Sequence, residues 1–392
     1  MKYNITFYCP DRHIRYNGGR LPDSKGVGGG VTVRIRMANA LASRGHKVSM
    51  ICNCIRDEFD GDVHYIPLDN IAEIETDVLI LTTSGDGLNL HPISNMAVNA
   101  KLIILLAHGV EKPQGLEQIP TDYFYAISRF IKGIMLNDWK VPSKKIFISY
   151  HGVTRESFQQ NRKSEISKER NPFRLAYLGH PQKGRKASIG VLRSLRNKNT
   201  KYHLHLFGDE RLWGTKAKMV WGVKGLKNFG LINQRKLAKE LLSCNFGIFL
   251  QSRQEPFGLT IIEAMAAGCI PIASSVGAFS EIIQNGKNGY LIEGNHDESS
   301  TWKRAADLIH ELQTDPVRLE ILRTNAQNWP LDWMDVAKTW EQHWDIVLGN
   351  RILEKSKNIE TCSECQSELF EFPDGFHCLS CGNFVKDIQE TI

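Results

Sequence analysis

The chain has 392 residues, of which 42% are hydrophobic and 23% charged, a globular composition with room for two or three domains. No stretch approaches the roughly 20 uninterrupted apolar residues of a membrane span, and the first residues lack the charged-then-apolar order of a secretion signal. These features argue against a membrane-spanning chain, and we expect a cytoplasmic protein.

The first 50 residues are basic, because they hold nine Lys or Arg against only Asp11 and Asp23, a local balance of +7 in a chain of formal charge +6. A basic surface attracts anions, so this region could bind an anionic substrate or the acidic surface of a membrane, as a peripheral membrane protein does. Solvated loop charge around one phosphate-facing glycine turn explains the same pattern equally well.

The first 150 residues alternate short apolar runs with helical stretches. The runs that we interpret as strands are YNITFYC, KVSMIC, DVLILTT, KLIILLAH and IFISY. Between the first two, residues 31–48 carry apolar side chains at helical spacing and include Gly45 as a stop signal. This alternation predicts an α/β, Rossmann-like domain over residues 1–155 with a buried parallel sheet.

Residues 156–171 are polar, charged and aperiodic, which predicts a linker. A second series of strands follows over residues 172–330, as FRLAYLG, YHLHLFG, FGIFLQ, CIPIAS and GYLI. Two Rossmann-like domains would leave a cleft at the carboxyl ends of their strands, where such folds bind ligands.

Residues 331–355 are expected to form a helix that packs back on the first domain. One face carries Trp333, Val336, Ala337, Trp340 and Trp344. We interpret this stripe as packing rather than as a platform for a cofactor.

The stretch 251–283, QSRQEPFGLTIIEAMAAGCIPIASSVGAFSEII, is the most informative. It predicts a strand that ends near Gln251, a loop, and a helix from about Thr260 to Ala267. The amides and positive dipole end at the start of such a helix bind anions such as a diphosphate. Glu255 before the helix and Glu263 within it can only accept hydrogen bonds, so next to a bound nucleotide sugar each would bind hydroxyl groups rather than phosphate.

Two glutamates with seven residues between them are weak evidence alone. Within EPFGLTIIEAMAAGCIPIAS, however, the pair closely resembles the signature of retaining GT-B glycosyltransferases, particularly family 4, and the resemblance extends over roughly residues 1–350. It implies two Rossmann-like domains facing a cleft, with Glu263 on the ribose and Glu255 on the donor sugar. It also implies that a run of backbone embraces sugar and phosphate, namely Phe257, Gly258, Leu259 and Thr260.

Further positions match the same family. Gly28, Gly29 and Gly30 look like its glycine turn, where the backbone approaches a phosphate or acceptor closely, although a flexible loop also explains Gly28. His108 stands where the family commonly places a histidine facing the donor sugar, and a structural role is the alternative. Gly208 occupies a strand end as in the family, and Glu281 matches a recurrent glutamate that we interpret as structural.

The sequence departs from the family at the diphosphate cations. The family usually has Gly-Arg after the first strand of its second domain, then Lys-Gly a few residues later. This chain reads LAYLGHPQKGRKAS, with Gly179 present and His180 in place of the arginine. Lys183 keeps the Lys-Gly pair, whereas Arg185 or Lys186 is nearest to the family's spacing, and the choice stays open.

No Asp-X-Asp motif with a flanking apolar strand is evident, so we predict transfer without a catalytic metal, with amides and cations neutralising the diphosphate. The resemblance implies retention of anomeric configuration, a nucleotide-diphosphate sugar as donor, and a glycan or lipid-linked acceptor. The alternative is a catalytically weak GT-B scaffold that acts as a binding or assembly protein through the zinc ribbon predicted below, and an epimerase or phosphorylase on this fold is a third possibility. The sequence does not identify the donor base, the sugar or the oligomeric state.

Five of the nine cysteines lie in apolar segments, where a free cysteine acts as a small hydrophobe. These are Cys9, Cys52, Cys54, Cys244 and Cys269. A disulfide framework is therefore not expected.

The other four cysteines, Cys362, Cys365, Cys378 and Cys381, form two Cys-X-X-Cys knuckles separated by twelve residues. With the hairpin-like FEFPDGFH between them, they predict a zinc ribbon over residues 359–386. Four cysteine ligands indicate a structural ion. A redox dithiol and a nucleic-acid contact are the alternatives, and the few cations of this tail argue against the second.

Overall fold

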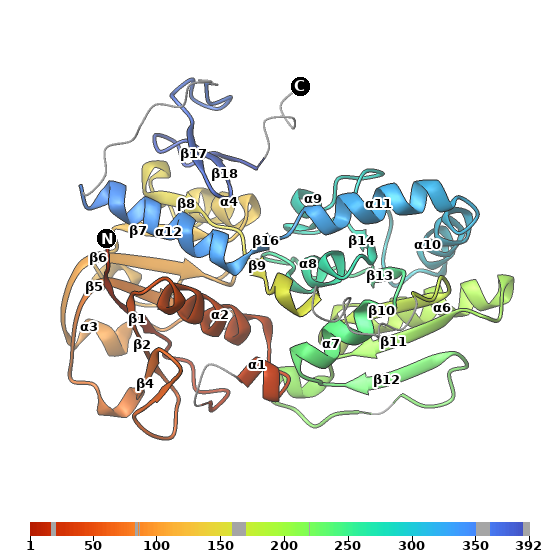
Figure 1. The fold of residues 1–392 in the computed structure, drawn as a ribbon, viewed down its shortest axis with the longest axis horizontal. Coiled ribbons are helices and arrows are strands. Elements are labelled where there is room, and N and C mark those ends of the chain that lie inside the picture. Colours follow the sequence, from red (N-terminus) through yellow and green to blue (C-terminus); the bar gives the residue numbers. More distant parts are fainter. Residues whose placement is uncertain are drawn as a thin grey trace. The chain divides into compact units, whose positions relative to one another are not determined.

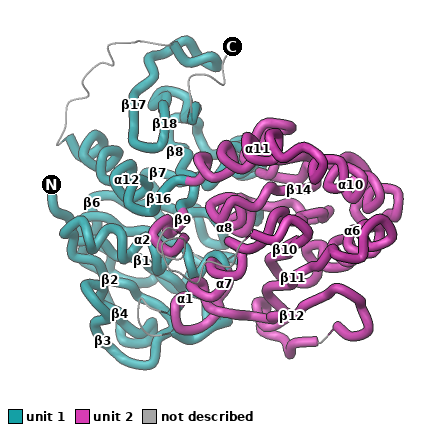
Figure 2. The backbone as a smooth tube through the Cα atoms, turned by 45° about the vertical axis from the view of Figure 1, so that its right-hand side comes forward, with its two compact units in different colours: residues 1–21, 29–152, 331–392 teal, residues 22–28, 153–330 magenta. Residues whose placement is uncertain are grey.

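The computed structural model describes residues 1–16, 21–82, 85, 87–158, 170–218, 220–349 and 361–386. The chain is α/β and divides into two compact units, as Figure 2 shows. Unit 1 comprises residues 1–21, 29–152 and 331–392, and unit 2 comprises residues 22–28 and 153–330. Most of the expected linker, residues 159–169, and the end of the expected C-terminal helical segment, residues 350–355, lie outside the described residues.

Unit 1 contains an eight-stranded sheet of order β3-β4-β2-β1-β5-β6-β7-β8, parallel except for the antiparallel β3–β4 pair. Its strands are β1 (Asn4–Tyr8), β2 (Lys47–Cys52), β3 (Glu58–Asp60), β4 (Val63–Pro67), β5 (Glu73–Thr82), β6 (Ala97–Ala107), β7 (Tyr123–Ala126) and β8 (Ile146–Ile148). β5 and β6 begin earlier than their apolar runs, because their first residues alternate between buried or half-buried and exposed. The predicted runs therefore locate only the buried half of each strand.

The helices of unit 1 include one that returns from the far end of the sequence (Figure 1). They are α2 (Gly29–Ser43), α3 (His91–Ser94), α4 (Arg129–Asn137) and α12 (Trp333–Val347). Short elements near the unit borders are α1 (Leu21–Ser24), β9 (Gly152–Val153) and β16 (Leu331–Asp332).

The tryptophan stripe of α12 is buried, as predicted for packing. The indole Nε1 of Trp340 donates to Ser149 Oγ at 2.6 Å, and Glu341 binds Arg44 and His46 beside the end of α2. These contacts lie within unit 1, so α12 completes the core of that unit.

Unit 2 contains a six-stranded parallel sheet of order β12-β11-β10-β13-β14-β15. Its strands are β10 (Arg174–Leu178), β11 (His203–Phe207), β12 (Leu226–Gly230), β13 (Phe246–Phe249), β14 (Ile270–Ser274) and β15 (Tyr290–Ile292). Its helices are α6 (Arg185–Lys198), α7 (Gln234–Leu241), α8 (Leu259–Ala266), α9 (Phe279–Ile282), α10 (Ser299–Leu312) and α11 (Pro316–Asn328). Parallel pairing places the carboxyl ends of β11, β10 and β13 side by side at one edge.

The C-terminal residues form a three-stranded antiparallel sheet of β17 (Phe370–Phe372), β18 (Gly375–His377) and β19 (Phe384–Val385). Phe372 pairs with Gly375, so FEFPDGFH is a hairpin as predicted. We call residues 361–386 the ribbon, which Figure 1 shows in blue. Among the described residues, no helix combines the length and the apolar character that crossing a membrane requires.

Candidate active site and metal centre

Helix α8 starts at the carboxyl edge of the unit 2 sheet. It follows a short loop after β13, and Gly258 precedes its first residue with φ of 113°. That left-handed conformation favours glycine, and a Cβ here would lie 3.0 Å from the ring of Phe279. The glycine therefore turns the chain sharply into a helix whose first amides have no partner within the helix.

Glu255 lies in this loop and contacts Lys183. The Lys183 Nζ is 2.8 Å from Glu255 Oε2, and the two side chains are only 27% and 15% exposed. Gln251 Nε2 also donates to Glu255 Oε2 at 3.3 Å, and the Glu255 carbonyl accepts from Ala278 N at 2.9 Å. The structure thus brings together two of the residues singled out from the sequence, one carboxylate and one cation.

Glu263 lies on α8 and is half-buried. Gln234, the first residue of α7, donates from Nε2 to Glu263 Oε1 at 3.0 Å. This neutral donor orients the carboxylate. A ribose hydroxyl would meet an acceptor that is already oriented.

The other two candidate cations are engaged elsewhere. Arg185 Nη2 is 3.0 Å from Glu210 Oε1, and both side chains are largely buried. Lys186 Nζ is 3.1 Å from Asp297 Oδ1 and its side chain is 71% exposed. Of the three cations that the sequence left open, Lys183 is the one that contacts Glu255.

His180 is buried and stacks on Trp213, with ring centroids 3.4 Å apart and an interplanar angle of 13°. The pKa of His180 is lowered to about 4, chiefly because burial disfavours the charged ring; Glu210 opposes this shift, and the nearby cations Lys183, Arg185 and Arg253 contribute to it. The imidazole is therefore neutral near pH 7. It cannot replace the charge of the arginine that the family usually has here.

Arg253 lies in the loop between β13 and α8, two residues before Glu255. Its guanidinium carbon is 4.9 Å from the centre of the Trp213 ring, which His180 contacts as well. Sequence reasoning missed Trp213 and Arg253. The signal that could have found them is position, because each follows a strand whose carboxyl end lies at this edge of the sheet.

The remaining predicted glycines of unit 2 lie at the same edge. Gly208 follows β11 with φ of 87°, and a Cβ there would lie 2.5 Å from the carbonyl oxygen of Gly179 after β10. The two turns therefore approach so closely that a side chain at position 208 does not fit. Phe257 is buried, and Leu259 and Thr260 form the first turn of α8.

Unit 1 holds the other predicted residues. Gly29 and Gly30 are the first residues of α2, which ends at Ser43, before Gly45 as predicted. His108 follows β6, is buried, and lies 3.1 Å through Nδ1 from Thr82 Oγ1. Its ring is 5.3 Å from that of His151, whose pKa burial and the neighbouring His108 lower.

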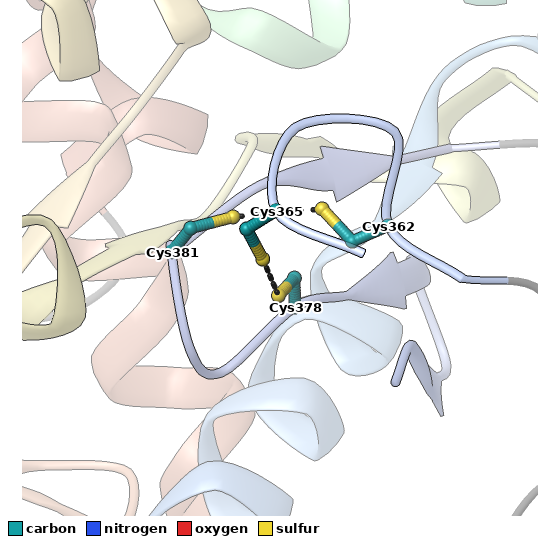
Figure 3. Close-up of side chains that lie close together, drawn as sticks. All are labelled: Cys362, Cys365, Cys378 and Cys381. Carbon is teal, nitrogen blue, oxygen red and sulfur yellow. Dashed lines mark hydrogen bonds between the residues drawn. The ribbon is translucent and has the colours of Figure 1, made fainter. Parts of the chain in front are cut away.

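The four ribbon cysteines cluster, as Figure 3 shows. Their sulfur atoms all lie within 4.8 Å of one another, with Cys362–Cys381 and Cys365–Cys378 separations of 3.5 Å. Four thiolates around zinc, with Zn–S near 2.3 Å, would lie about 3.8 Å apart. The cluster therefore fits a tetrahedral zinc ion, and Asn383 Nδ2, 3.6 Å from Cys362 Sγ, supplies a supporting hydrogen bond.

The ribbon packs against the edge of the unit 1 sheet. Arg129 Nη2 donates to the Phe384 carbonyl at 2.8 Å, and Ser143 donates to the Cys381 carbonyl. His377 stacks on Phe147 of β8 with centroids 4.4 Å apart and 5° between the planes. The metal knuckles are therefore part of unit 1 rather than a detached tail.

Residues 158–329 match the family model described as glycosyl transferases group 1. A D-inositol 3-phosphate glycosyltransferase 1 from Catenulispora acidiphila is 39% identical over 79 residues, which is 20% of this chain and 18% of that protein. A phosphatidyl-myo-inositol mannosyltransferase from Mycobacterium tuberculosis is 27% identical over 126 residues, 32% of this chain and 33% of that protein. The matched regions thus span well under half of these relatives.

Two solved structures share the fold over most of the chain. A glycosyltransferase from Rickettsia africae aligns with a TM-score of 0.61 at 15% identity, covering 89% of this chain and 100% of that one. Alr3699/HepE from Anabaena, in complex with UDP-glucose, aligns with a TM-score of 0.58 at 15% identity, covering 88% and 100%. The predicted fold, two Rossmann-like sheets of GT-B type with an added ribbon, is confirmed.

Proposed function

We propose that this chain, which shares the GT-B fold and matches the glycosyl transferases group 1 model over residues 158–329, moves a sugar from a nucleotide-diphosphate sugar to a glycan or lipid-linked acceptor. The contact between Lys183 and Glu255 beside the start of α8 carries this proposal. One place offers a cation for phosphate, a carboxylate for sugar hydroxyls and helix amides for an anion. A scaffold that had lost its donor site would not need these groups together.

The donor would bind with its phosphates at the first turn of α8. Lys183 would exchange Glu255 for a phosphate oxygen, and the freed carboxylate would accept from a hydroxyl of the sugar. Glu263, oriented by Gln234, would accept from the ribose hydroxyls. The pair in the free protein is thus a preformed arrangement that keeps both groups near their working positions.

In the transfer step the bond between the anomeric carbon and the phosphate oxygen breaks, and a bond from that carbon to the acceptor oxygen forms on the same face. The acceptor's proton passes to the departing phosphate, so anomeric configuration is retained without a protein nucleophile. Lys183 and the α8 amides stabilise the charge that grows on the leaving diphosphate. Arg185, held by Glu210, adds a second positive charge nearby.

Unit 1 would supply the acceptor side. Gly29 and Gly30 at the start of α2 allow close approach of the backbone to a phosphate or acceptor, and His108 would contact the donor sugar. His108 is held by Thr82, which fixes the orientation of the ring. These roles rest on the family resemblance and on the local geometry of unit 1.

The zinc of the ribbon would be structural, since all four ligands are cysteines and two of them are buried. Amides and cations suffice for the diphosphate, so the transfer itself would need no metal ion. The ion would instead fix the ribbon against the edge of the unit 1 sheet.

A donor panel tests the proposal. The protein is incubated with UDP-, GDP-, ADP- and dTDP-sugars, beginning with UDP-glucose, the ligand of the Anabaena structure. Release of free nucleoside diphosphate with one donor, lost in Glu255→Ala, is the expected result. Absence of release and of binding by calorimetry for every donor would favour the scaffold alternative.

A further inference from the structure

The segment that joins β11 to β12 is strongly basic. Residues 211–227 hold Arg211 and four lysines without one Asp or Glu. The four lysines are Lys216, Lys218, Lys224 and Lys227, and all of them are exposed. Figure 1 shows the segment running along the outer edge of the unit 2 sheet, beside the edge strand β12.

Asp209 neutralises Arg211, the first residue of this segment, but not the lysines that follow. The other acidic residue just before the segment, Glu210, binds Arg185. Among the described residues, no carboxylate forms an ion pair with any of the four lysines. The ammonium groups of Lys216, Lys218 and Lys224 are therefore available to an external anion, whereas that of Lys227 lies over the Phe229 ring, 4.4 Å from its centre.

The same segment exposes tryptophan. Trp221 is 78% exposed, more than any other large apolar side chain among the described residues, and Trp213 is 41% exposed. Val220 and Val223 beside Trp221 pack partly against the core of unit 2. These contacts of Val220 and Val223 leave the Trp221 side chain exposed to solvent. Transfer of its indole into an apolar environment would be favourable.

We propose that this segment, residues 211–218 and 220–227, docks unit 2 on an anionic membrane surface. Tryptophan prefers the boundary between headgroups and acyl chains, and exposed lysines are attracted to anionic lipids. The combination of one prominent indole with clustered lysines fits this surface. Vesicle binding needs neither donor nor acceptor, so the inference does not rest on the proposed transfer reaction.

This location differs from the basic N-terminal region that the sequence offered for the same purpose. There, Arg12 pairs with Asp69, Arg34 is fully buried against Asp11, and Arg44 pairs with Glu341. Internal pairs thus take up part of the N-terminal charge, whereas the four lysines of the β11–β12 segment have no carboxylate partner among the described residues.

The segment also adjoins the candidate donor site, because Trp213 stacks on His180 and lies under Arg253. A surface-bound protein would hold this edge of unit 2 close to the lipid headgroups. A lipid-linked acceptor would then reach the site without leaving the bilayer.

The test is co-sedimentation of the full chain with vesicles of phosphatidylcholine, with and without phosphatidylglycerol. We expect binding only to the anionic vesicles. Each lysine near such a surface contributes about 1 kcal/mol, or about fivefold in partitioning, so Lys216→Glu with Lys218→Glu should weaken binding at least about 25-fold. The matched control is Lys287→Glu with Lys303→Glu, which makes the same change of charge at two exposed lysines of unit 2 outside the segment, and it should bind normally.

Quenching by brominated lipid tests the indole directly. The wild type should show quenching of tryptophan fluorescence on anionic vesicles, and Trp221→Phe should remove most of it while the circular dichroism spectrum stays unchanged. The proposal is overturned if the wild type ignores anionic vesicles, or if the control variant loses as much binding as the lysine variant. Tighter binding to a single-stranded RNA oligonucleotide, with no vesicle binding, would reassign the segment to nucleic acid.

Discussion

Replacing Lys183 by Met keeps most of the side-chain length and removes the charge, which isolates the electrostatic role of this residue. If Lys183 stabilises the leaving diphosphate, its loss should cost about 3–4 kcal/mol in the transition state, or roughly 10²–10³ in kcat. The rate is measured as nucleoside diphosphate released at saturating donor. Lys183→Arg, which restores the charge with a different shape, should recover part of the rate.

The same change affects stability, because Glu255 is 15% exposed and would keep only the 3.3 Å hydrogen bond from Gln251. Two unit charges about 4 Å apart attract by about 4 kcal/mol at an effective dielectric constant of 20, and desolvation offsets most of this. We expect a net loss of about 1 kcal/mol, or roughly 2–4 °C in Tm for a unit of this size.

Lys198→Met is the matched control, since Lys198 lies at the end of α6 and pairs with Asp307 at 2.9 Å. It removes a more exposed ion pair away from the candidate site and should leave kcat unchanged. If Lys183→Met retained kcat within about threefold of the wild type, the assignment of Lys183 to the diphosphate would be refuted.

Three further outcomes are expected. Glu263→Ala should weaken donor binding about tenfold or more in calorimetry, because a charged acceptor for ribose is lost, and an unchanged affinity would contradict its role. Folding lowers the pKa of His180 from the usual value near 6.5 to about 4. Between pH 6.5 and pH 4 the unfolded chain therefore binds more protons than the folded one, so the free energy of unfolding should fall as the pH drops through this range. His180→Gln should flatten that loss in thermal scans at pH 7 and 5, and an unchanged slope would argue against a buried neutral imidazole. Removing zinc by chelation should lower the Tm of unit 1 while unit 2 still binds donor, and loss of donor binding would show that the ribbon does more than support unit 1.

The features that were predicted correctly from the sequence are those that depend on local patterns. Alternating apolar runs located the sheets of both units, the helix predicted from about Thr260 to Ala267 matches α8 to within one residue at each end, and the spacing of the four ribbon cysteines indicated one metal cluster. Each of these signals depends on residues close together in the chain, where periodicity and backbone preference act directly.

Features that depend on partners distant in sequence were not foreseen. His180, Trp213 and Arg253 come from three separate loops, and only the strand order of the sheet brings them together. The choice among Lys183, Arg185 and Lys186 likewise depends on which carboxylate each meets. No pattern indicated that residues 22–28 belong with unit 2, because a segment of seven residues is too short to show a helical or strand periodicity.

The division of the chain also sets an order of events during synthesis. Residues 153–330 of unit 2 are contiguous, whereas unit 1 needs α12, whose buried Trp340 and Trp344 come nearly 200 residues after Val153. Once residues 1–330 have emerged from the ribosome, unit 2 therefore has all of its residues, whereas unit 1 still lacks α12. The N-terminal sheet exposes part of its apolar core until α12 has been synthesised and packs on it. A chaperone would be needed most during that interval.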